Sequence, residues 1–222
     1  MKNTIKLILL LVAASASLSA ATINGTSFVN GTLTGGVILN KGPAAPAGTV
    51  NANFGFFNNG FNIENAVSTL DYAGLFSNFN IVAAANVGST AVIYGENYAG
   101  VFETGAFSFT TDANSIGRTI HAFYTGGAAL SQLSITNGYA LVSSGKVITA
   151  DGFPPADYVM PIEGTLVGTN SASGFTTAVF NAPNAGQVNV TATALNLNLV
   201  PEPSTALFGA IGALGLLRRR RN

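Results

Sequence analysis

Cysteine and tryptophan are absent from this chain of 222 residues, and histidine occurs once, as His121. Without cysteine there is no disulfide, no thiolate nucleophile and no thiolate ligand for zinc, and a single histidine does not assemble a zinc site. Charged residues make up only 8% of the sequence. A dense cationic surface is therefore missing as well, and we expect no nucleic-acid partner.

Motifs of nucleophilic and nucleotide chemistry are also missing. The chain has no Gly-x-Ser-x-Gly elbow, and Gly145-Lys146 is followed by Val147 without the upstream glycine of a phosphate loop. His121 falls in a predicted strand, where a sheet histidine without a catalytic role is the simpler interpretation. We therefore predict a protein that is not an enzyme and that carries no cofactor and no metal.

The strongest pattern that is present lies at the C-terminus. Val200-Pro201-Glu202-Pro203-Ser204 precedes thirteen residues without charge, 205–217. The prolines disfavour helix before Pro203, so a helix begins after it. Thirteen helical residues span roughly 20 Å, which is short for a bilayer core of about 30 Å. Four arginines follow the apolar run, and arginines are typical of the cytoplasmic end of a membrane segment. They predict a short membrane helix whose C-terminal end lies in the cytoplasm. The four residues are Arg218, Arg219, Arg220 and Arg221.

This order of motif, apolar run and basic end resembles the PEP-CTERM sorting signal, found in exported proteins of Gram-negative bacteria that make extracellular polysaccharide. The resemblance covers residues 200–222. It implies that Pro201, Glu202 and Pro203 are recognised by an exosortase, a membrane transpeptidase-like enzyme that cleaves near them. The implied route is transient anchoring in the inner membrane, followed by release to the cell surface or extracellular matrix.

The N-terminus carries a second targeting signal. Lys2 and Lys6 precede an apolar run, 7–12, and a stretch of small residues, which together predict a secretory signal peptide over 1–21. The small residues Ser19, Ala20 and Ala21 form the expected cleavage region, with a cut after Ala21, or alternatively after Ala20 or Ala16. The secretion machinery is the implied partner, and the body then lies outside the cytoplasm.

Removing both signals leaves residues 22–199 as one domain. Two of the nine basic residues lie in the leader and four in the tail, and one of the nine acids is Glu202. Three basic residues and eight acids remain in the body, giving it a net charge of −5. Nucleic acid and anionic membrane surfaces are therefore unfavourable partners.

Short apolar runs separated by Gly, Asn and Asp predict an all-β body. Val50, Ala52, Phe54 and Phe56 alternate with other residues and share one face of a strand, which ends at the turn 58–60. Further strands are predicted over 81–84, 91–94, 106–111 and 119–125. Asn137-Gly138 predicts a two-residue hairpin between 133–136 and 139–142, and a bulge near Ala194 is expected in a last strand over 188–199.

One short helix is expected to interrupt the strands. Ser68-Thr69-Leu70-Asp71 resembles a capping box, and apolar residues follow at roughly helical spacing as far as Asn80. The spacing of strands and turns predicts a single β-sandwich ectodomain, jelly-roll-like, with the signal helix and the membrane helix outside the fold. A β-solenoid is the alternative, but no repeat of fixed period supports it.

Three further chemistries stay open at this point. Glycoside hydrolysis needs a pair of carboxylates, and Asp112-Ala113-Asn114 begins like a calcium loop although Ile116 stands where an oxygen ligand belongs. Exposed tyrosines can serve as sugar-binding platforms, although core or sheet-edge positions are the simpler interpretation. The acids of the body are Glu64, Asp71, Glu96, Glu103, Asp112, Asp151, Asp157 and Glu163, and the tyrosines considered are Tyr94, Tyr98, Tyr124, Tyr139 and Tyr158.

The sequence thus predicts an exported surface or matrix protein with a structural or adhesive role linked to exopolysaccharide or biofilm. A carbohydrate-binding module with the same address is the alternative, and a glycoside hydrolase comes third.

Overall fold

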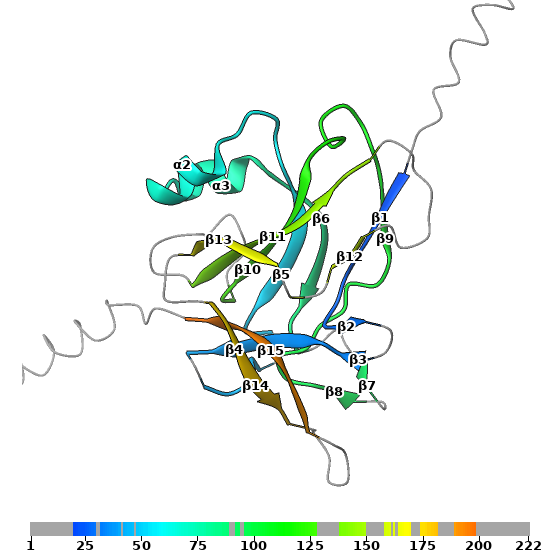
Figure 1. The fold of residues 1–222 in the computed structure, drawn as a ribbon, viewed down its shortest axis with the longest axis vertical. Coiled ribbons are helices and arrows are strands. Elements are labelled where there is room, and N and C mark those ends of the chain that lie inside the picture. Colours follow the sequence, from blue (N-terminus) through cyan, green and yellow to red (C-terminus); the bar gives the residue numbers. More distant parts are fainter. Residues whose placement is uncertain are drawn as a thin grey trace, which may run out of the picture.

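The computed structural model describes residues 20–29, 32–40, 42–46, 48–88, 92–93, 96–127, 138–149, 158–160, 162, 164–169, 174–181 and 189–198. These residues form mainly β-strands with a few short helices, which confirms the predicted all-β class. Figure 1 shows a five-stranded sheet in the upper part of the molecule and a three-stranded sheet below it. A second three-stranded sheet lies along one side.

The five-stranded sheet is antiparallel throughout. Its central strands, β5 and β10, are buried almost along their whole length because both faces of the sheet are covered. Two of the predicted strands, 50–56 and 119–125, are confirmed here, the second with the same bounds. The order across the sheet is β13 (Thr165–Thr169), β11 (Tyr139–Val147), β10 (Thr119–Thr125), β5 (Asn51–Phe57) and β6 (Phe79–Asn86).

Each three-stranded sheet contains one parallel pair of strands. One sheet joins β14 (Gly174–Phe180), β15 (Val190–Leu197) and β4 (Gly35–Leu39), with β15 and β4 parallel. The other sheet joins β12 (Tyr158–Met160), β1 (Ala20–Gly25) and β9 (Phe107–Thr110), with β1 and β12 parallel. Two short ribbons complete the described strands, namely β2 (Phe28–Val29) with β3 (Thr32–Leu33) and β7 (Val92–Ile93) with β8 (Glu96–Asn97).

The main core lies between the five-stranded sheet and the two smaller sheets. The predicted inward face of β5, from Val50 to Phe56, forms part of this core. The ring of Phe54 lies directly on Gly25 of β1, where any Cβ atom would overlap it. Phe102 and Tyr124 surround Phe54 at ring distances of 5.9 and 6.4 Å. Glycine at position 25 therefore allows the two sheets to approach.

The prediction of one helix over 68–80 is wrong. Within the described stretch 48–88 the chain forms two helices, α2 (Ile63–Ser68) and α3 (Tyr72–Ser77), and it turns between them at Leu70, whose φ is +57°. Left-handed backbone at a leucine ends one helix and starts another. Phe79 and Asn80 belong to β6 rather than to a helix, because β6 pairs with β5 from Phe79 onward.

Side chains cap both helices, but not in the predicted way. The Oδ1 atom of Asn62 accepts a hydrogen bond from the Asn65 N–H at 2.9 Å, and Oδ1 of Asp71 accepts one from the Gly74 N–H at 2.8 Å. Asp71 therefore begins α3 instead of closing a capping box with Ser68.

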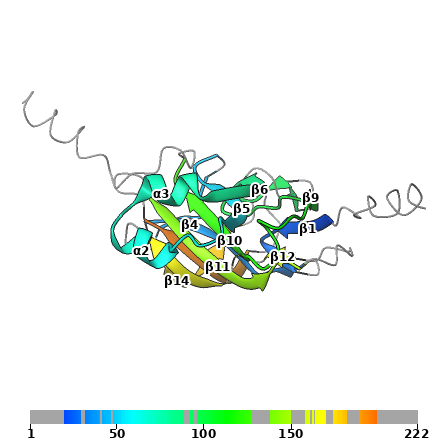
Figure 2. The ribbon, with the colours of Figure 1, turned by 90° about the horizontal axis from the view of Figure 1, so that it is seen from above.

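The two helices cover the second face of the five-stranded sheet. Ala66 and Leu75 pack there with Phe57, Phe123 and the neighbouring aromatic side chains of the sheet. Figure 1 places α2 and α3 beside β11 and β13, away from β4, β14 and β15, and Figure 2 shows both helices on the opposite side of the molecule from β1 and β9. The helices thus lie over a face of the five-stranded sheet.

The predicted two-residue hairpin at Asn137-Gly138 lies partly outside the described residues, because Asn137 and the first arm, 133–136, are not described. The second arm, 139–142, is part of β11. It pairs with β10, where Thr125 lies opposite Tyr139, and with β13 on its other edge.

The predicted bulge in the last strand is also wrong. The register between β14 and β15 is continuous from Gly174 to Phe180. Ala194 packs in a small core beneath this sheet, whereas Leu195 and Leu197 pack in the main core on its other face. Burial on both faces explains the change of phase that suggested a bulge.

The described residues include the end of the predicted N-terminal signal but none of the predicted C-terminal signal. Strand β1 begins at Ala20, and Ala21 is only 2% exposed, so the predicted boundary after residue 21 falls inside this strand. Residues 1–19 and 199–222 lie outside the described part, and the predicted terminal helices with them. Within the described residues, neither helix has the length and hydrophobicity required to cross a bilayer.

The aromatic cluster generates a stability prediction. The Tyr124 hydroxyl is buried without a hydrogen-bond partner among the described residues. We expect Tyr124→Phe to leave the free energy of unfolding unchanged or to raise it, because an unsatisfied buried hydroxyl costs about 1–3 kcal/mol. Phe54→Ala should lower that free energy by about 3–5 kcal/mol. Urea unfolding of the two variants measures both effects. If Tyr124→Phe lowered the free energy of unfolding by more than about 1 kcal/mol, the Tyr124 hydroxyl would have to be hydrogen-bonded, contrary to the description above.

Candidate functional site: a groove beside strand β14

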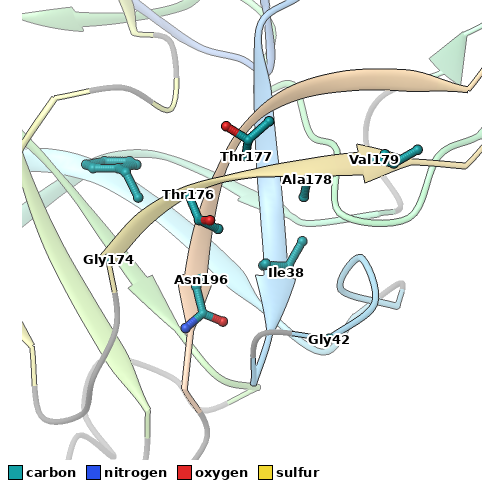
Figure 3. A pocket seen from close by; sticks show the side chains of 9 residues that line it. Ile38, Gly42, Gly174, Thr176, Thr177, Ala178, Val179 and Asn196 are labelled. Atoms are coloured by element: carbon teal, nitrogen blue, oxygen red, sulfur yellow. The ribbon is translucent and has the colours of Figure 1, made fainter.

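A concavity in the described residues lies beside strand β14. It has a volume of about 610 Å³. Figure 3 shows Thr176 and Ala178 of β14 on one side, with Ile38 of β4 and Asn196 of β15 close by. The remaining lining residues are Gly42, Gly174, Phe175, Thr177 and Val179.

One aromatic contact fixes the position of β14. The ring of Phe180, at the end of the strand, lies on Gly36 of β4 and approaches Gly100, and both lack a side chain that would displace it. Asn196 of β15 pairs with Gly174 at the other end of β14. Strand β14 is therefore anchored through Phe180 on its inner face.

The side chains of β14 alternate between two environments. Ala178 and Phe180 pack in the small core beneath the sheet. Phe175 and Val179 point to the opposite side and remain 37% and 52% exposed. Thr177 lies between them on this exposed side, because strand residues two apart share a face.

The groove is electrically neutral. None of its lining residues is charged, and its polar side chains are Thr176, Thr177 and Asn196. Asn196 is 4% exposed, so its amide is held in place within the sheet. Such a surface suits neutral, hydroxyl-rich or backbone-like ligands, whereas acid–base catalysis needs an ionisable group that this groove does not supply.

His121 occupies a sheet position, as the sequence analysis favoured. It is 6% exposed, its Nδ1 lies 2.9 Å from the Thr119 carbonyl oxygen, and its ring packs edge-on against Phe57 at 5.4 Å. Burial lowers the pKa of His121 below its usual value, opposed by the hydrogen bond to Thr119. The surroundings thus favour a neutral, packed imidazole.

The calcium-like sequence at Asp112 forms a self-contained turn. Oδ1 of Asp112 accepts hydrogen bonds from the backbone N–H groups of Asn114 and Ser115, and Oδ2 accepts one from the Asn114 amide. These bonds, with those to Ser115 foremost, lower the pKa of Asp112. The Asp-x-Asn pattern therefore has a local structural role. No group of three or more potential metal-binding side chains occurs among the residues described.

The acids that the structure describes do not converge on the groove. Glu64 lies in the first turn of α2, Asp71 caps α3, and Glu103 forms an isolated bridge with Thr26. Glu96 belongs to β8, but its side chain is outside the description, as are Asp151, Asp157 and Glu163.

Three of the tyrosines considered as sugar platforms are core residues instead. Tyr98, Tyr124 and Tyr139 are buried, which confirms the simpler interpretation for them. Burial raises the pKa of Tyr139 to about 12, with Tyr72 adding to the rise. Tyr94 and the side chain of Tyr158 are not described.

The residues of the predicted sorting signal are not brought into any described site. Pro201, Glu202, Pro203 and the four arginines, Arg218 to Arg221, lie outside the described residues, as does Ser19. Ala20 is exposed and Ala21 buried, side by side at the start of β1.

The groove itself was missed at the sequence level. Its available signal was the run Gly174–Phe180, which places two adjacent threonines among apolar residues and contains neither charge nor proline. Comparison adds no further guide, because no protein-family model, curated protein or solved structure matches this chain.

The buried histidine leads to a pH prediction. Its pKa is lower in the folded than in the unfolded protein, so the unfolded state binds more protons below about pH 6.5. Stability should therefore be full above that pH and should fall as the pH decreases through 6 toward 5. Urea midpoints of wild type and His121→Phe measure this, and the variant should lose less stability over the same interval. Parallel curves for the two proteins would show that His121 does not titrate on unfolding.

Proposed function

We propose that this chain is an exported, non-enzymatic protein of the cell surface or extracellular matrix, with a structural or adhesive role linked to exopolysaccharide or biofilm. An exosortase recognises Pro201-Glu202-Pro203 and cleaves near it, after transient anchoring in the inner membrane. The body, 22–199, is the working part. We also infer that its stacked sheets are a β-sandwich, although the parallel pairs β1–β12 and β15–β4 depart from a simple jelly roll.

The observation that carries this proposal is the arrangement of the C-terminus. Strand β15 ends at Leu197, only four positions before Pro201. Every described strand of the three sheets ends at or before Leu197, upstream of the motif. Cleavage near the motif thus cuts through no described strand, as a cleavable tail requires.

The buried start of β1 bears on where the predicted N-terminal signal peptide is cut. A cut after Ala21 removes Ala20 and Ala21 from β1, and Ala21 belongs to the main core. Ala14-Ser15-Ala16 supplies the small residues that signal peptidase prefers. We therefore favour the cut after Ala16 among the three sites.

The sorting proposal predicts a change in the C-terminus of the mature protein. Wild type should end upstream of the arginines and be recovered at the surface or in the medium. Replacement of Pro201, Glu202 and Pro203 by alanine should leave the chain uncut, ending at Asn222, in the membrane fraction. Mass spectrometry of both fractions identifies the terminal residues of the protein. The N-terminal peptide of the mature protein should begin at Ser17.

A matched control replaces Ser204 and Thr205 by alanine, which leaves the motif and the apolar run in place. This variant should be processed like the wild type. Recovery of wild-type protein that still ends at Asn222 would refute exosortase processing.

A carbohydrate-binding module is the second candidate, and one feature of the groove favours it. The partly exposed ring of Phe175 shares a face of β14 with Thr177, so an apolar platform adjoins a neutral hydrogen-bonding group at the groove. Sugars are bound by this combination of ring and polar groups. A glycoside hydrolase ranks third, because no carboxylate lines the groove.

The carbohydrate alternative predicts retention on the producing organism's own exopolysaccharide. Phe175→Ala should weaken retention about fivefold, the effect of losing roughly 1 kcal/mol of ring contact. Phe107→Ala is the control, since Phe107 is also exposed, at 49% against 37% for Phe175, but lies on β9 in another sheet. Affinity electrophoresis in gels that contain the polysaccharide measures the effect. Equal mobility of all three proteins would remove this alternative.

A further inference from the structure

The outer edge of β14 is open within the described residues. No backbone hydrogen bond outside the ladder with β15 involves this strand there. The outer edge of β4 is occupied, because Val37 donates to the Gly100 carbonyl and accepts from the Ala45 N–H. Strand β13 lies against α2, where Val67 packs on Gly168. Within the described residues, the outer edge of β14 therefore offers unused backbone donors and acceptors to another chain.

Strand β14 also lacks the features that keep sheet edges apart. Natural edge strands are protected by lysine, proline, bulges or very short length. Gly174–Phe180 has seven residues, no charge and no proline, and its register with β15 is regular. Its threonine, valine and phenylalanine side chains favour strand pairing. An edge of this kind pairs with other strands unless something opposes it.

The spacing of the exposed side chains identifies the partner. Phe175 and Val179 lie symmetrically about Thr177, two residues to either side. We propose that β14 pairs with β14 of a second copy of this chain, antiparallel and about a two-fold axis at Thr177. In this register Phe175 of each copy lies opposite Val179 of the other, and the two Thr177 side chains face each other.

This register satisfies the chemistry of cross-strand pairs. Aromatic residues pair favourably with β-branched ones, and threonine pairs with threonine. Gly174 comes opposite Phe180, so the buried ring meets no opposing side chain. No like charges face each other, because the strand has no charged residue.

The size of the contact makes it weak between two isolated molecules. Seven strand residues extend about 24 Å, and a sheet about 10 Å thick gives an edge of roughly 240 Å². Stable dimers bury about 800 Å² per partner. The pairing therefore becomes substantial where copies are concentrated, as on a surface or in a matrix. It needs only a folded β14 and is independent of sorting, so each proposal can fail without the other.

The absence of cysteine from the chain allows a specific test. Thr177→Cys in the full-length protein places two thiols opposite each other in the proposed pair, within reach of a disulfide. Mild oxidation at high protein concentration should give several-fold more covalent dimer than Thr191→Cys. Thr191 is the matched control, because it is exposed on the same face but lies on β15, away from the edge. All variants share the same termini, so association through the tail contributes equally.

The register is tested by mixing two further single-cysteine proteins. Phe175→Cys and Val179→Cys should cross-link with each other several-fold more than either does with itself, because the identical positions are about 14 Å apart along the strands. Circular dichroism checks that each variant retains its strands. Equal yields from Thr177→Cys and Thr191→Cys would overturn the pairing, as would the absence of any preference in the mixture.

Discussion

The contact of Phe54 with Gly25 is the constraint on which the arrangement of the sheets depends. Phe54 projects from the five-stranded sheet, and its ring occupies the space that a side chain at position 25 of β1 would fill. Phe102 and Tyr124 enclose the same ring. Full burial of one such ring contributes about 1.5–3 kcal/mol, a large share of a net stability of about 5–15 kcal/mol. A chain without disulfides thus joins its sheets by packing aromatic rings on glycine.

The same device recurs at β14 and determines what remains accessible there. Phe180 lies on Gly36 and anchors the strand from its inner face. Phe175 and Val179 are left on the exposed side, and Thr176 and Ala178 line the groove. The groove, the carbohydrate alternative and the proposed pairing therefore have one structural origin. Phe180 fixes one end of the strand, the side chains of Thr176 and Ala178 on that same face line the groove, and the other face and the edge stay open.

Local patterns in the sequence were sufficient for some elements and insufficient for others. The alternation in β5 and the apolar run of β10 predicted both strands, because burial against a sheet imposes a period of two along the chain. The helix over 68–80 failed because the positive φ of Leu70 and the cap at Asp71 are local choices that apolar spacing does not reveal. The groove was not predicted because it forms only where β14 lies in one sheet with β15 and β4, and β4 is distant from both in the sequence.

The distribution of charge explains why two copies would meet at the edge of β14. The body has a net charge of −5, so two bodies repel each other in most orientations. At physiological ionic strength this repulsion fades beyond about 8 Å, and close approach is decided by the surfaces that meet. The edge of β14 is uncharged and offers backbone hydrogen bonds, so it is a surface where approach adds attraction without adding like charges. An acidic body with a neutral edge at β14 therefore favours a defined contact between copies over unspecific aggregation.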